Sequence, residues 1–306
     1  MSESTEKWEQ AVTEQAVTEQ AVLEQAERDQ GLLGQSLRDQ AVPEQASADD
    51  VLLNPAARDQ TGPALPRPPK SLLRQVGRAI ADFGMIRDGD RILLGVSGGK
   101  DSLSLLEVLR HLRSYAPVRF ELAVLTIDPE VPGFDPAPLT DWYQQRGLPW
   151  YYERQPIMEQ ARAHMDGDSF CAYCARMKRG IMYRLCRAHG YNVLALGQHL
   201  DDLAESLMLS MFHGGQLRTM KAHYRNDAGD VRIIRPLVYC RERQMRDFAL
   251  HAGLPVVPDS CPACFQMPTR REHMKALLAR EEADHPQLFA SLLRAMRPLL
   301  REGPVD

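Results

Sequence analysis

The stretch Ile92–Leu109, "ILLGVSGGKDSLSLLEVL", contains a buried-strand pattern that turns at once into a helical pattern. Glycines between the two let backbone N–H groups approach an anion closely, and the start of a helix adds partial positive charge. The lysine can neutralise phosphate oxygens, and the aspartate after it can hold Mg2+. The predicted phosphate-binding loop consists of Ser97, Gly98, Gly99, Lys100, Asp101 and Ser102. Its glycine spacing differs from the Walker loop and from the dinucleotide fingerprint.

Apolar runs and helical patterns alternate on both sides of this loop. Strands are predicted over residues 91–96, 120–128, 150–154, 192–197 and 231–237. Helices are predicted over 72–83, 101–113, 138–146, 172–189, 201–212, 242–252, 269–280 and 286–294. This alternation predicts an α/β fold, a parallel sheet with helices on both faces. Ligands of such sheets bind beyond the C-terminal strand ends, where Ser97, Asp128 and the segment after Gly197 fall.

The composition is that of a soluble globular protein, since 44% of the 306 residues are hydrophobic and 25% are charged. No apolar run approaches the roughly 20 residues of a membrane-spanning helix. The N-terminus is acidic and rich in Gln, which does not suit a secretory or transit peptide. We therefore expect a cytoplasmic enzyme without a membrane partner.

The first 66 residues differ from the rest in charge and in pattern. They contain 13 acidic and 4 basic residues, a net charge of −9, which leaves 33 basic and 28 acidic residues in the remainder. Gln recurs every five residues from Gln10 to Gln45, a spacing that lines no single helix face. We expect a disordered tail over 1–66, with a partner-binding helix as the alternative. The second predicted part, 67–306, is one domain with a C-terminal cysteine pair and helices.

A second motif, "GQHLDD", follows the predicted strand at 192–197. Gly197, His199, Asp201 and Asp202 lie at the strand end and at the start of the next helix. A carboxylate at a helix start can cap backbone N–H groups, and it can also complete a Mg2+ site with Asp101. For Asp202 we favour the second role.

The chain has six cysteines, four of them in two Cys-x-x-Cys pairs. The pairs are Cys171–Cys174, at a predicted helix start, and Cys261–Cys264; Cys186 and Cys240 stand alone and are expected in the core. Their spacing leaves open a four-thiolate zinc site, an iron–sulfur cluster and a redox pair.

The loop resembles the PP-loop of the ATP pyrophosphatases, which cleave ATP between its α and β phosphates. The order of "SGGKDS", "CAYCARMKRGIMYR", "GQHLDD", "MFHGGQLRTM", "IRPLVYCRERQMRDFA" and "LPVVPDSCPAC" is similar to that of the tRNA 2-thiocytidine biosynthesis proteins. The resemblance covers about residues 71–300. It implies an ATP-dependent tRNA sulfurtransferase that adenylates and thiolates C2 of an anticodon-loop cytidine.

The resemblance also implies cofactors and partners. A [4Fe-4S] cluster would be bound by Cys171, Cys174 and Cys264, with Cys261 as the alternative third ligand. ATP and Mg2+ would bind at the loop together with Asp128, Gly197, His199 and Asp202, and Lys100, Asp101 and Asp202 would be catalytic. The implied partners are tRNA, a sulfur donor such as a cysteine desulfurase, and a second copy in a homodimer.

Basic residues after the first cysteine pair and near the last strand could contact tRNA phosphates or form a solvated face. They are Arg176, Lys178, Arg179, Arg218, Lys221, Arg225, Arg241 and Arg243. Two alternatives to the sulfurtransferase reading stay open. One is another PP-loop tRNA-modifying enzyme, of the 2-thiouridine type; the other is a non-catalytic tRNA-binding protein with a four-cysteine zinc site.

Overall fold

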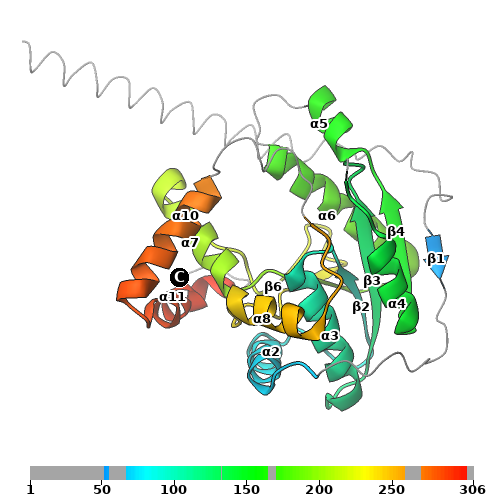
Figure 1. The fold of residues 1–306 in the computed structure, drawn as a ribbon, viewed down its shortest axis with the longest axis horizontal. Helices are drawn as coiled ribbons and strands as arrows, with labels where there is room; N and C mark the ends of the chain where they lie inside the picture. Colours follow the sequence, from blue (N-terminus) through cyan, green and yellow to red (C-terminus); the bar gives the residue numbers. More distant parts are fainter. Residues whose placement is uncertain (1–51, 55–66, 132, 165–169, 259–269, 302–306) are drawn as a thin grey trace, which may run out of the picture. The chain divides into compact units, whose positions relative to one another are not determined.

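Seven strands form one mostly parallel sheet in the part of the chain that the structure describes (Figure 1). This computed structural model describes residues 52–54, 67–131, 133–164, 170–258 and 270–301. The order across the sheet is β1-β4-β3-β2-β5-β7-β6, with antiparallel pairs only at its two edges. The strands are β1 (Leu52–Asn54), β2 (Asp90–Gly95), β3 (Phe120–Asp128), β4 (Trp150–Arg154), β5 (Val193–Ala195), β6 (His223–Arg225) and β7 (Arg232–Ile234).

The centre of the sheet is strand β2, which leads into the glycine loop. Ile92 pairs with Leu122 of β3 on one side and with Val193 of β5 on the other, both in parallel register. Successive side chains of β2 enter different cores, since Leu94 belongs to one buried cluster and Leu93 to another on the opposite face. Burial on both faces explains why this strand is a continuous apolar run rather than an alternating pattern.

Helices follow most of the strands, as the alternating pattern predicts. They are α2 (Lys70–Phe83), α3 (Lys100–Tyr115), α4 (Ala137–Gln145), α5 (Ile157–His164), α6 (Phe170–His189), α7 (Leu200–Gly214), α8 (Glu242–Ala252), α10 (Arg270–Asp284), α11 (Leu288–Met296) and the 3-10 turn η2 (Arg297–Leu300). Among the helices described, none has the length and apolar character needed to cross a membrane.

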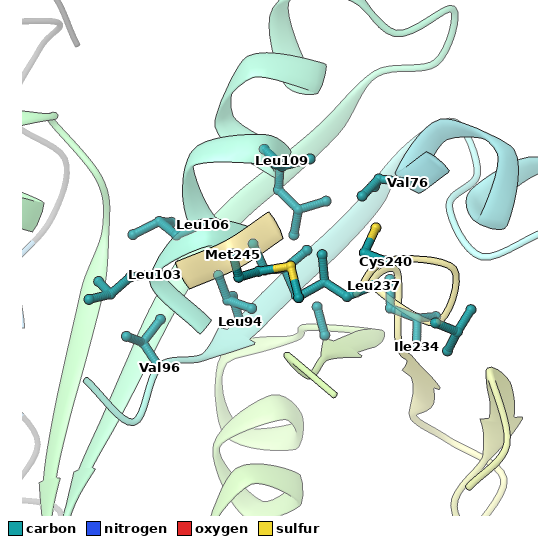
Figure 2. Packing of buried hydrophobic residues seen from close by; sticks show 14 of the residues in the cluster. Val76, Leu94, Val96, Leu103, Leu106, Leu109, Ile234, Leu237, Cys240 and Met245 are labelled. Atoms are coloured by element: carbon teal, nitrogen blue, oxygen red, sulfur yellow. The ribbon is translucent and has the colours of Figure 1, made fainter. Parts of the chain in front are cut away.

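The loop rests on a packed apolar base that joins three elements (Figure 2). Leu103, Leu106 and Leu109 of α3 pack in one cluster with Leu94 of β2 and Met245 of α8. All five side chains are fully buried. Because α8 follows the last parallel strand, this packing places its first residues beside the loop, more than a hundred positions away in sequence.

Three short elements were not predicted from the sequence. Strand β1 lies inside the segment 1–66 and pairs with β4, β6 pairs with β7 through the loop 226–231, and α5 packs against α6. Strands of three residues are too short for a periodic apolar signal. The division of the chain at residue 66 remains a prediction, since residues 1–51 and 55–66 lie outside the described part.

Candidate active site

The loop at the C-terminal end of β2 has a backbone that depends on its first glycine. Gly98 has φ +88°, a conformation that other residues rarely adopt, and a side chain there would lie 3.0 Å from Cβ of Val257. The carbonyl of Gly98 accepts a hydrogen bond from the N–H of Val257 at 3.0 Å. Gly99 is the N-cap and Lys100 the first residue of α3. The strand, the glycine turn and the helix start are therefore arranged as an anion-binding loop requires.

Lys100 has two carboxylate partners, one from its own helix and one from α8. Its Nζ lies 3.1 Å from Oδ2 of Asp101 and 2.9 Å from Oε1 of Glu242. The second oxygen of Glu242 binds Nζ of Lys275, on α10, at 2.6 Å. Burial alone would raise the pKa of Glu242, but the hydrogen bonds from Lys275 and Lys100 outweigh it and lower the pKa to about 2. Glu242 is therefore ionised at neutral pH and stabilises the Lys100 ammonium.

Asp101 keeps one carboxylate oxygen unused. Its Oδ1 is buried and has no hydrogen-bond partner among the described residues, and Nε2 of His199 lies 3.7 Å away. Burial raises the pKa of Asp101, although the nearby His199 and Lys100 act in the opposite direction. An unsatisfied carboxylate oxygen beside a phosphate-binding loop is suited to a hard cation such as Mg2+.

His199 and Asp202 form a reciprocal cap at the start of α7. The N–H of Asp202 donates to Nδ1 of His199 at 3.4 Å, and the N–H of His199 donates to Oδ2 of Asp202 at 2.9 Å. The other oxygen of Asp202 binds Arg271 at 2.6 Å, and Arg271 also binds Glu205 at 2.8 Å. The structure thus gives Asp202 a capping contact and leaves its role toward Mg2+ a prediction.

Asp201 differs from its neighbour, because both of its oxygens join α7 to α8. Oδ2 accepts from the N–H of Glu242 at 2.7 Å, and Oδ1 accepts from Nε of Arg241 at 3.0 Å. The same guanidinium forms two hydrogen bonds with Glu282 of α10, at 2.6 and 2.8 Å. Arg241 is therefore engaged inside the protein, so we no longer count it among the basic residues that contact tRNA.

The remaining predicted residues lie at neighbouring strand ends. Gly197 follows β5, and a Cβ at this position would lie 3.1 Å from the backbone N and Cα of Ser102. Asp128 ends β3, where it accepts hydrogen bonds from the hydroxyl of Tyr152 and, at 2.8 Å, from the N–H of Glu130. The absence of a side chain at Gly197 lets the "GQHLDD" segment approach the loop, as both motifs require.

The first cysteine pair lies in the first turn of α6, as predicted. Cys171 and Cys174 are three residues apart in the helix, so they share one face of it, and Cys174 is partly buried against the core. Cys261 and Cys264 lie outside the described residues, so the choice of third ligand remains a prediction. Cys186 and Cys240 are buried in the two cores, as expected, and burial raises both thiol pKa values to about 12.

Comparison with known proteins assigns this arrangement to a family. The model of the PP-loop domain matches residues 70–276. The tRNA-cytidine(32) 2-sulfurtransferase of Geobacter sulfurreducens is 44% identical over 228 residues, which cover 74% of this chain and 89% of the relative. That of Polynucleobacter asymbioticus is 38% identical and covers 78% of each chain. This chain belongs to the PP-loop tRNA-cytidine(32) 2-sulfurtransferase family.

A solved structure has a fold similar to that of this chain. The U34-tRNA thiolase NcsA from Methanococcus maripaludis, solved with its [4Fe-4S] cluster, has a TM-score of 0.63. The match covers 78% of this chain and 80% of NcsA at 20% sequence identity. At that identity the likeness shows a shared fold, and it confirms the predicted α/β class, with a sheet that is mostly parallel rather than wholly so.

Sequence reasoning missed one carboxylate and two cations at this site, Glu242, Lys275 and Arg271. With Lys100, Asp101 and Asp202 they form a network of ion pairs, which we call the charge network. Glu242 is the second partner of Lys100, and Lys275 and Arg271 extend from α10 to Glu242 and Asp202. Glu242 is the first residue of the helix predicted after the last strand. The aspartates of "GQHLDD" likewise lie at the start of the helix that follows their strand. That shared position is the one signal that could have identified Glu242.

Proposed function

We propose that this chain is an ATP-dependent tRNA sulfurtransferase that converts cytidine 32 of the anticodon loop to 2-thiocytidine. The family supports tRNA as substrate and sulfur transfer as reaction. The observation that carries the proposal is the loop itself, in which Lys100 and the unsatisfied Asp101 oxygen meet at the start of α3. No other segment described combines a glycine turn, a helix start and these two groups.

The loop residues have separate roles toward ATP. Backbone N–H groups from Ser97 to Ser102 hold the phosphates, and Lys100 neutralises charge that develops when pyrophosphate leaves. Gly98 and Gly99 keep the backbone accessible, while Gly197 keeps the neighbouring turn close. Asp128, at the end of the adjacent strand, and His199 complete the nucleotide site.

Asp101 and Asp202 are proposed to hold the Mg2+ that accompanies ATP. Oδ1 of Asp101 fits the ion, because it is buried and has no partner among the described residues. Both oxygens of Asp202 accept hydrogen bonds, from His199 and Arg271, so Asp202 would have to exchange one of them for the ion. Mg2+ would neutralise phosphate charge and orient the leaving group.

The chemistry consists of two displacements. Cytosine O2 attacks the α-phosphate, the bond to pyrophosphate breaks, and pyrophosphate leaves with the electron pair. A sulfide equivalent, supplied by a donor such as a cysteine desulfurase, then adds at C2, and the C2–O bond breaks with release of AMP. Lys100 and Asp101 serve the first displacement, and positioning of both reactants lowers the barrier further.

A [4Fe-4S] cluster is proposed at Cys171, Cys174 and a third thiolate, Cys264 or alternatively Cys261. Two thiols one helical turn apart fit such a donor set, and the start of α6 favours the thiolate form. When bound, the cluster supplies an open iron that binds and activates sulfide.

The test is anaerobic turnover with unmodified tRNA, Mg-ATP and sulfide. We expect tRNA-dependent AMP formation and the exchange of one oxygen for sulfur in cytidine 32, seen by mass spectrometry of digested tRNA. Asp247→Asn, an exposed change on α8, serves as the matched control and should behave as wild type. Sulfur in uridine instead would favour the 2-thiouridine alternative. One zinc per chain with neither AMP nor thiolation would contradict the proposal.

A further inference from the structure

Exposed apolar side chains gather at the C-terminal end of α7, away from the nucleotide loop. Met211 is 40% exposed, Phe212 55% and Leu217 68%. They account for half of the six large hydrophobic side chains that are exposed in the described residues. The first half of α7 is buried, with Leu203 and Leu207 in the core, whereas residues 211–215 at its end are exposed. An exposed phenylalanine beside two other apolar side chains is typical of a binding surface.

The chain after α7 folds back along the helix and holds this cluster together. The N–H of Gln216 donates to the carbonyl of Ser210 at 3.1 Å, and the Ser210 hydroxyl donates to the carbonyl of Gln216 at 2.8 Å. Further on, the hydroxyl of Thr219 donates to the carbonyl of Leu203 at 2.7 Å. The first two contacts place Leu217 and Arg218 next to the last turn of the helix. The third places Thr219 beside its first turn, and Arg235 joins the carbonyl of Lys221 to Gln198, so Lys221 lies near the start of α7.

The surroundings of the cluster are basic. Residues 206–226 contain no aspartate or glutamate, whereas they include Arg218 and Lys221. No ion pair joins either side chain to a carboxylate in the part of the chain described. We call the set Met211, Phe212, Leu217 and Arg218 the α7-end surface.

Charge and chemistry select the occupant of this surface. The same face of a second copy would bring two Arg218 side chains together without a carboxylate, which is costly. RNA satisfies both features, because a phosphate pairs with Arg218 and an unstacked base can lie on the phenylalanine ring. Phe212 lies ten residues along α7 from Asp202, about 15 Å at the helical rise, so one RNA loop can reach both.

We propose that the α7-end surface binds the tRNA substrate, with Phe212 stacking on an unpaired base and Arg218 contacting a phosphate. The inference rests on the proposed function, which supplies tRNA as the substrate. It assigns a substrate contact to a part of the chain outside the nucleotide site.

The experiment measures the affinity of the full-length protein for unmodified tRNA and, separately, for ATP. We expect Phe212→Ser to weaken tRNA binding about tenfold, Phe212→Tyr to retain it, and ATP affinity to stay unchanged in both. Leu250→Ser removes a more exposed apolar side chain, 83% exposed on α8, and should bind tRNA as wild type does. Arg218→Gln should lower the salt dependence of binding by about one phosphate contact.

The outcomes separate this inference from the proposed function. If wild-type protein does not bind tRNA, the proposed function fails and takes the inference with it. If wild type binds but all surface variants bind equally well, only the inference is overturned. Sedimentation that shows Phe212→Ser turning a dimer into a monomer, with tRNA affinity unchanged, would make the surface a protein interface and would also overturn it.

Discussion

The two ends of helix α7 carry basic residues in opposite electrostatic settings. At its start, Arg271 binds Asp202 and Glu205, and the neighbouring Lys100 binds Asp101 and Glu242. At its far end, Arg218 lies in a stretch, residues 206–226, that contains no aspartate or glutamate. Cations near the loop are thus held in place by counter-ions, whereas Arg218 at the α7-end surface keeps its charge for a partner. A cation paired with a carboxylate is held in a defined position, whereas a cation without such a partner attracts anionic ligands.

The largest effect should come from removing the loop ammonium. Lys100→Met should lower tRNA-dependent AMP formation by about a hundredfold or more, because no other described cation contacts Asp101 and faces the loop. The affinity for tRNA should stay within about twofold of wild type. Steady-state kinetics with a parallel tRNA-binding assay measures both. A comparable loss of tRNA affinity would break the distinction between the two ends of α7.

The next effect concerns stability in acid. Glu242 has a folded-state pKa of about 2 against an ordinary value of 4.5. Its stabilising contribution is therefore complete above pH 4.5 and is lost as pH falls toward 2. Wild type should exceed Glu242→Gln in unfolding free energy by about 2 kcal/mol at pH 6, after allowance for solvent screening.

Denaturant titrations of both proteins at several pH values measure this difference. The gap should narrow between pH 4.5 and 2 rather than widen. A difference that does not change with pH would show that Glu242 contributes by packing instead of by its charge. Asp247→Asn provides the baseline for an exposed carboxylate on the same helix.

A somewhat smaller effect is expected on turnover when the second partner of Lys100 is lost. Glu242→Gln should lower kcat about tenfold, because Lys100 then keeps only Asp101 as a counter-ion. In the Lys100→Met background, Glu242→Gln should cause no further loss of kcat, because Glu242 acts through Lys100. Equal losses in both backgrounds would contradict this coupling.

The smallest effect is expected one contact further away. Lys275→Met removes the cation on the outer oxygen of Glu242 and leaves the Lys100 contact at 2.9 Å intact. Turnover should fall only about threefold. Arg246→Gln, an exposed change on α8, is the matched control for loss of a surface charge. If Lys275→Met lowers turnover as much as Glu242→Gln does, α10 would have to be counted as part of the nucleotide site.

Sequence could predict the strands and helices whose apolar pattern extends over many residues, and the turn whose backbone requires glycine. Strand β2 and helix α3 flank two glycines, and the structure places them as expected. Helix α2 begins at Lys70, two residues before its predicted start, with Pro69 as its N-cap. A proline fits this position because its fixed φ suits a helix start and its missing N–H is not needed there.

The charge network was beyond sequence reasoning because it depends on which helices pack together. Lys100 and Glu242 are 142 positions apart, and they meet because α3 and α8 share one apolar cluster. Asp201 and Asp202 are adjacent in sequence, yet one joins α7 to α8 and the other caps α7. Only the direction of each side chain separates these roles.

The two lone cysteines have a practical consequence for thiol chemistry. With pKa values of about 12 and no exposed surface, Cys186 and Cys240 remain protonated and shielded at neutral pH. Alkylating reagents act on thiolates, so these two positions should contribute no background when native protein is labelled. A thiol count on folded protein therefore reports on the paired cysteines alone, and protection by a bound metal centre can be read directly from it.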